Sequence, residues 1–325
     1  MTTLDNLSAE QTFRNLTNIE KIQGSVTFGL GSIPKGEYHI NYRNLNISQD
    51  LANEFSSLLN KKIEHLKKDV EEQNIRLFEY NAGYKAERDV VEWVKFENVT
   101  WLANLLSDIP EPVDIPLFDR REKEFLKDLR FYAIFGEDQN HNKIIGFSFY
   151  NKMKEITQSN QILTRFIGDR FELVTGAGFI FDERIDCIAY GDYIFSFSKF
   201  RFHKIFRYYD KMREVAQESM TTINSCIPIS DFDGFQTACM SHFQKFSKLV
   251  NIAEKPYLST LKMTDIRKSI NKHNLPLEII MEDGIEKLKF EKQNVWVILN
   301  VIDDAYLDSV MTNRNYEVNS KRLLQ

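Results

Sequence analysis

The chain of 325 residues is poor in residues that break or crosslink a fold, with 13 glycines, 7 prolines and 3 cysteines. So little glycine and proline excludes a collagen-like or linker-like protein. Three cysteines at spacings of 39 and 13 do not suit a disulfide framework. We therefore expect reduced thiols and a cytoplasmic protein.

Long apolar segments are also missing. The longest uninterrupted apolar runs, 131–135 and 295–299, have five residues each, whereas a membrane-spanning helix needs roughly 20. The first 25 residues lack a basic start followed by an apolar stretch. The sequence therefore predicts neither a membrane span nor a secretory signal.

The short motifs of several enzyme classes do not occur. There is no Gly-Lys-Ser/Thr, which excludes a P-loop, and no Gly-x-Ser-x-Gly of a serine hydrolase. Gly29-Leu30-Gly31 and Gly176-Ala177-Gly178 lack the third glycine of a dinucleotide site, and we expect turns there. Cys226, Cys239 and His242 supply three zinc ligands where a structural site needs four. We therefore predict no catalytic residue, no metal and no cofactor.

One enzymatic alternative stays open, a metal-dependent nuclease. Such an enzyme holds a divalent cation between carboxylates, and Asp182, Glu183 and Asp186 are close in sequence. Asp303 and Asp304 are weaker candidates. The lysine of a D/E-x-K motif is missing, and an alternating strand would turn Glu183 away from the two aspartates. Solvated strand ends are the competing interpretation.

A proline-rich stretch suggests two domains. Pro110, Pro112 and Pro116 fall within PEPVDIP, and proline fixes φ and disfavours helix in the preceding residue. We predict an α+β protein with an N-terminal mixed α/β module (1–115) and a larger C-terminal domain (116–325) of antiparallel strands and packed helices. Residues 1–150 have a net charge of -6 and residues 151–325 of +1. The second half is the better candidate for binding an anion.

Periodicity places the main elements. Apolar residues at helical spacing follow Ser48 and predict an amphipathic helix over 51–70. Polar turn residues predict a hairpin of 130–135 with 143–150, and Gly191-Asp192 predicts a second one, of 185–190 with 193–198. We expect helices over 199–222 and 231–253, and a last hairpin around Glu282-Asp283-Gly284.

The strongest local signal is basic. Residues 199–213, KFRFHKIFRYYDKMR, contain six Lys and Arg and one Asp. At 100° per residue, one helix face would carry Arg201, Lys204, Arg207, Tyr208 and Lys211, opposite an apolar face with Phe202, Phe206 and Tyr209. A second basic stretch, 245–273, adds Lys262, Arg267, Lys268 and Lys272.

Two interpretations of these cations compete. Lys and Arg contacts to phosphates carry affinity for double-stranded DNA without reading its sequence. Glu214 and Glu218 share the basic helix face, so solvated ion pairs on an ordinary surface are the alternative.

Two segments, FDERIDCIAYGDYIFSFSKFRFHKIFRYYDKM (181–212) and LNVIDDAYLDSVMTNRNYEVNSKR (299–322), resemble the KwaB family of the Kiwa anti-phage system. The resemblance covers roughly 125–325 and depends on the order of the motifs, since none is a short catalytic signature. It implies a cytoplasmic, dimeric DNA-binding effector that is recruited to the inner face of the membrane by KwaA, a membrane-embedded partner. It also implies that phage DNA replication or expression is hindered, and it assigns no catalytic residue.

Overall fold

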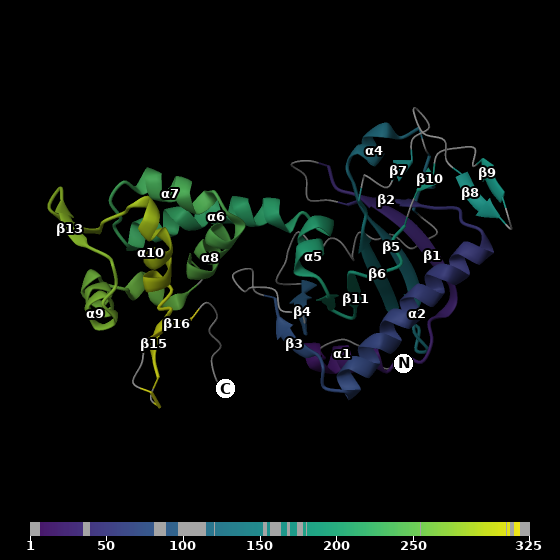
Figure 1. The fold of residues 1–325 in the computed structure, drawn as a ribbon, viewed down its shortest axis with the longest axis horizontal. Coiled ribbons are helices and arrows are strands. Elements are labelled where there is room, and N and C mark those ends of the chain that lie inside the picture. The colour runs from purple at the N-terminus through teal and green to yellow at the C-terminus, as the bar shows by residue number, and fades with distance from the viewer. Residues whose placement is uncertain are drawn as a thin grey trace. The chain divides into compact units, whose positions relative to one another are not determined.

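A computed structural model describes the chain over residues 7–34, 40–80, 89–96, 115–119, 121–151, 155–156, 164–167, 170–173, 178–179, 181–253, 255–309, 311–312 and 315–318. The chain forms two compact units (Figure 1), one of residues 1–80 and 86–208 and the other of residues 81–85 and 209–325. The α+β class is confirmed. The expected boundary in the proline-rich stretch lies inside the first unit, so the structure divides the chain differently from 1–115 and 116–325.

The first unit is organised by an eight-stranded sheet in the order β2-β1-β5-β6-β11-β12-β4-β3. All neighbouring strands are antiparallel except β3 and β4, which are parallel. The strands are β1 (Gln23–Ser32), β2 (Asn41–Asn44), β3 (Arg76–Glu79), β4 (Val90–Lys95), β5 (Leu129–Glu137), β6 (Lys143–Phe149), β11 (Cys187–Tyr190) and β12 (Tyr193–Ser196). Four precede residue 116 and four follow it, which is why no domain boundary falls there.

The two predicted hairpins of this sheet are confirmed as β5–β6 and β11–β12. Gly191 between β11 and β12 has φ +57°, a conformation that glycine adopts without strain. The unit also contains α4 (Lys123–Lys127) and two short antiparallel ribbons: β7 (Glu155–Ile156) with β10 (Gly178–Phe179), and β8 (Thr164–Ile167) with β9 (Arg170–Leu173).

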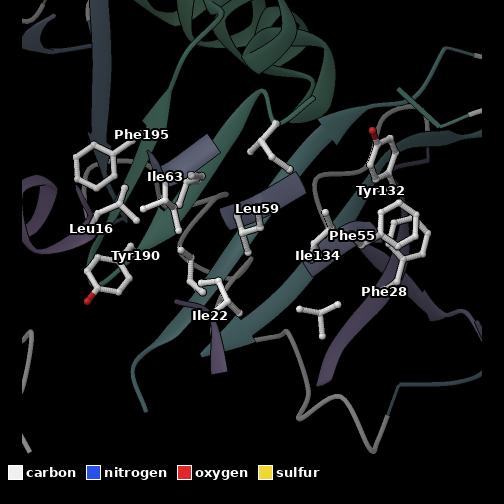
Figure 2. Packing of buried hydrophobic residues seen from close by; sticks show 14 of the residues in the cluster. Leu16, Ile22, Phe28, Phe55, Leu59, Ile63, Tyr132, Ile134, Tyr190 and Phe195 are labelled. Atoms are coloured by element: carbon white, nitrogen blue, oxygen red, sulfur yellow. The ribbon is translucent and has the colours of Figure 1, made fainter. Parts of the chain in front are cut away.

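Helices α1 (Ala9–Thr17) and α2 (Gln49–Glu71) bury their apolar sides against one face of the sheet. The predicted helix is confirmed in α2, where the Ser48 hydroxyl accepts the Leu51 N–H as an N-cap. Figure 2 shows the core between these helices and the sheet, with Phe28, Phe55 and Tyr132 grouped at one end. The Phe28 and Phe55 rings stack with centroids 4.0 Å apart.

The opposite face of the sheet is covered by α5 (Lys199–Ile205) and the residue that follows it. Successive residues of a strand point to opposite faces. Tyr132 therefore contacts Phe28, with ring centroids 5.5 Å apart, while its neighbour Phe131 contacts Phe206 at 6.2 Å.

The expected turn at Gly29-Leu30-Gly31 is wrong, because these residues lie inside β1. Gly31 is directly opposite Phe131, and a Cβ at Gly31 would lie 2.1 Å from the Phe131 ring. The glycine is therefore needed for the space that an aromatic partner takes up, not for a turn. Gly178 lies in β10, and Gly176 falls outside the described residues.

We expect Gly31→Ala to lower the free energy of unfolding by about 2 kcal/mol, since the added methyl overpacks a core that cannot yield. Gly29→Ala is the control, because its Cβ would come no nearer than 3.2 Å to a neighbouring atom. Urea unfolding of both variants measures the difference. Equal midpoints would contradict the role given to Phe131.

The second unit is mainly helical and includes most of α6 (Tyr208–Cys226), of which Tyr208 belongs to the first unit. Its other helices are α7 (Phe232–Met240), α8 (Phe243–Ala253), α9 (Met263–His273) and α10 (Val295–Ile302), with 3-10 turns η3 (Pro256–Thr260) and η4 (Lys292–Asn294). Two hairpins complete it: β13 (Ile279–Glu282) with β14 (Ile285–Leu288), and β15 (Tyr306–Asp308) with β16 (Asn315–Glu317). The predicted turn at Asp283-Gly284 is confirmed, with φ +56° and +76°.

Candidate nucleic-acid interface

The basic segment 199–213 does not form one helix. Helix α5 ends at Ile205 and α6 starts at Tyr208, and Arg207 between them has φ +51°. Phe206 is fully buried, with its ring 5.3 Å from that of Phe147. Packing of this ring against the sheet outweighs local helix propensity, so the angles assigned on a single helical wheel fail beyond Phe206.

Two predicted contact residues are consequently buried. Arg207 is 7% exposed and its guanidinium donates to the Pro34 carbonyl. Tyr208 is also 7% exposed, and its ring stacks on His203 with centroids 5.4 Å apart. The exposed basic face that the helical wheel placed at these two residues is therefore wrong, and both side chains belong to the packing of the first unit.

Arg201 forms an ion pair with Asp186. Its Nη1 lies 2.8 Å from Asp186 Oδ1, and the Arg184 Nε approaches the same oxygen at 3.2 Å. The other carboxylate oxygen accepts the backbone N–H of Phe149 at 2.8 Å. Asp186 is only 2% exposed, so this cluster joins α5 to the ends of β6 and β11. A predicted DNA contact and a predicted metal ligand neutralise each other.

Two more acidic residues of the nuclease alternative, Asp182 and Asp303, also form ion pairs. Asp182 forms an ion pair with Arg184 at 2.8 Å, and Asp303 one with the buried Lys248 at 3.2 Å. In the part of the chain that the structure describes, no group of three or more His, Cys, Asp or Glu side chains is placed to hold a metal ion. A divalent cation at Asp186 would have to displace two guanidinium groups, which disfavours the interpretation as a metal-dependent nuclease.

Lys204 is the predicted contact on α5 that projects into solvent. Its Nζ lies 5.5 Å from the centre of the Phe200 ring, and no carboxylate among the described residues pairs with it. Phe200 itself is 67% exposed. Lys211 lies in α6, and its side chain is outside the described part of the structure.

Most of the second basic stretch is neutralised by carboxylates. Arg267 pairs with Glu286 at 2.6 Å, Lys268 with Asp265 at 3.4 Å, and Lys272 with Asp308. Glu286 and Asp308 come from the hairpins β13–β14 and β15–β16, so a charge count restricted to 245–273 could not include them. Lys262, the N-cap residue of α9, is exposed and has no carboxylate partner among the described residues.

Two further cations belong to the two basic stretches, although neither is among the predicted DNA contacts. Arg213 on α6 and Lys255 before η3 are exposed and, within the described ranges, unpaired. Within the two basic stretches, the exposed cations that have no carboxylate partner among the described residues are Lys204, Arg213, Lys255 and Lys262, which we call the unpaired cations.

A buried polar network in the first unit escaped sequence reasoning altogether. The Tyr80 hydroxyl and His203 Nε2 are 2.7 Å apart, and the Lys199 Nζ lies 3.1 Å from Glu92 and 4.9 Å from the centre of the Tyr80 ring. Burial, aided by the Lys199 charge, lowers the pKa of His203 to about 3. Burial also raises the pKa of Tyr80 well above its usual value. The partners are separated by more than 100 positions, so no spacing rule connects them.

Comparison with known proteins identifies a family. A family model described as Kiwa protein KwaB-like matches residues 126–312, which is more than half of the chain. No curated protein and no solved structure matches. Among the described residues, no helix has the length and apolar character that crossing a bilayer requires.

Proposed function

The chain belongs to the Kiwa protein KwaB-like family, and we propose that it acts in anti-phage defence by binding double-stranded DNA without sequence preference. Family membership supports a role in the Kiwa system. The observation that carries DNA binding is the set of unpaired cations, exposed on α5, on α6, before η3 and at the start of α9. Ammonium and guanidinium groups of this kind attract phosphates and carry no base information.

This proposal revises the set of DNA contacts that the sequence predicted. Lys204 and Lys262 remain, Arg213 and Lys255 join them, and Lys211 stays on the sequence argument alone. Arg267, Lys268 and Lys272 would reach a phosphate only by leaving their carboxylate partners. Each unit thus contributes its own phosphate contacts, and Arg201, Arg207 and Tyr208 support the fold behind them.

Salt dependence tests this mechanism. If the four unpaired cations each neutralise about one phosphate, the slope of log K against log salt is about -3.6, and affinity falls about 150-fold from about 50 to about 200 mM salt. Lys204→Glu and Lys262→Glu should each make the slope of log K against log salt less negative by about 0.9 or more. Fluorescence anisotropy with a labelled duplex measures the slopes.

The matched control is Lys67→Glu, which makes the same charge change on the exposed side of α2. Its slope should equal that of the parent. A Lys204→Glu, Lys262→Glu double variant with the parent's slope and affinity would contradict the proposed surface. The same samples, incubated with plasmid and Mg²⁺ or Mn²⁺, test the nuclease alternative, for which nicking is the required result.

We further propose a homodimer that acts with a KwaA-like membrane protein at the inner face of the membrane and hinders phage DNA replication or expression. Family membership supports this, and a dimer doubles the phosphate contacts, so the salt slope should approach about -7. Light scattering measures the mass in solution. Co-purification with the membrane partner, with and without DNA, tests the assembly, and a monomer that captures no partner would contradict it.

A further inference from the structure

A polar cavity of about 690 Å³ lies in the first unit, where α2 passes the starts of β3 and β4. The volume is within the range of small-molecule sites, which runs from about 300 to about 1,000 Å³. Polar side chains dominate its lining, whereas sites for apolar ligands are mostly hydrophobic. These side chains are Lys62, Asp69, Gln73, Asn74, Arg76 and Asp89.

Lys62 is a partly buried cation on the wall of this cavity. Its Nζ lies over the Phe197 ring, 3.8 Å from the ring centre. Asp69 and Asp186 act on it through space, but no described residue forms a hydrogen bond or ion pair with it. Burial lowers the pKa of Lys62, which indicates that its ammonium is partly desolvated.

A partly desolvated ammonium has three donors, and no described protein group accepts from them. An oxyanion entering the cavity would supply the missing acceptor, and charge-assisted bonds of this kind are short and strong. The Arg76 side chain, also on the cavity wall, adds a second positive charge at the start of β3. The cationic part of the lining therefore favours a phosphate.

The other polar side chains of the cavity favour a ligand that carries hydrogen-bond donors. Asp69 and Asp89 offer carboxylate oxygens, and Gln73 and Asn74 offer side-chain amides. Carboxylates accept from the hydroxyl groups of a sugar, and the cavity is larger than a single phosphate requires. We propose that this cavity binds a phosphate monoester of a hydroxyl-rich small molecule, of the nucleotide or sugar-phosphate class, with its phosphate on Lys62.

Calorimetry with AMP, adenosine and inorganic phosphate tests the site. We expect AMP to bind saturably, and adenosine, which lacks the phosphate, to bind at least about tenfold more weakly. Lys62→Met should weaken AMP binding by about tenfold or more, while Lys61→Met, an exposed neighbour on α2, should not. No saturable AMP binding to the parent, or equal binding by the parent and Lys62→Met, would overturn the proposal.

Two measurements keep the outcome clear. Lys62→Met should unfold at an equal or higher urea concentration than the parent, because it replaces a poorly solvated ammonium by a thioether of similar length. It should also retain the parent's DNA affinity, which separates this site from the proposed DNA surface. In the unaltered protein, AMP should protect Lys62 but not Lys61 from acetic anhydride, as mass spectrometry would show, and equal acetylation with and without AMP would contradict the site.

Discussion

Lowering the pH from 7 to 4 is expected to reduce the free energy of unfolding by about 3 kcal/mol through His203 alone, since each pKa unit corresponds to about 1.4 kcal/mol. The folded-state pKa of His203 is about 3, and that of an unfolded histidine is about 6.5. Between these values the unfolded chain binds the proton and the folded chain does not, so stability decreases as the pH falls. Above about pH 6.5 the contribution is complete.

The physical cause is the network around the imidazole. Its Nε2 contacts the Tyr80 hydroxyl, its ring stacks on Tyr208, and the Lys199 ammonium, held by Glu92, opposes a second positive charge. A proton on His203 would therefore be both poorly solvated and repelled. Neutral His203 suits this site at physiological pH.

His203→Gln tests this prediction, because glutamine can still meet the Tyr80 hydroxyl and does not titrate. The variant should lose most of the pH dependence between about 6.5 and 4, whatever its stability at pH 7. His65→Gln, on the exposed side of α2, is the control and should follow the parent. Urea midpoints across this pH range measure both, and parallel curves for parent and His203→Gln would show that another group dominates.

Local patterns predicted the elements whose signals lie within a few residues. Helix α2 followed from apolar spacing after a capping Ser48, and the turn at Gly191 followed from the need for a positive φ. Gly31 of β1 was misjudged because the reason for this glycine, the ring of Phe131, lies 100 positions further along the chain. Periodicity reports which face is buried but not what occupies the space opposite.

The candidate site was harder to predict than the fold. A charge count covers one short segment of the sequence, whereas the partners in an ion pair can come from distant segments. Arg267 looked available until β14 placed Glu286 beside it. The basic helix looked continuous until Phe206 packed on the sheet and turned Arg207 and Tyr208 inward. Lys204 and Lys262 are exposed and have no carboxylate partner among the described residues, so they stay predicted DNA contacts.

Asp186→Ala is expected to lower the free energy of unfolding by about 3 kcal/mol, near the lower end for breaking a buried ion pair, because both arginines are about one-third exposed. The substitution leaves the guanidinium groups of Arg184 and Arg201 near each other without their shared counter-charge. It also removes the acceptor of the Phe149 N–H. Asp182→Ala, which removes the partner of a single arginine, should cost less, about 1 kcal/mol.

A double-mutant cycle distinguishes a stabilising ion pair between Arg201 and Asp186 from a loss of packing at either residue. If Arg201 and Asp186 stabilise the fold through their ion pair, Arg201→Met combined with Asp186→Asn should cost about 1 kcal/mol less than the sum of the single variants. Arg201→Met should at the same time leave the salt slope of DNA binding unchanged, since its guanidinium faces a carboxylate rather than a phosphate. If the effects of the two substitutions on the free energy of unfolding were additive, and Arg201→Met made the salt slope shallower, Arg201 would contact DNA instead of Asp186.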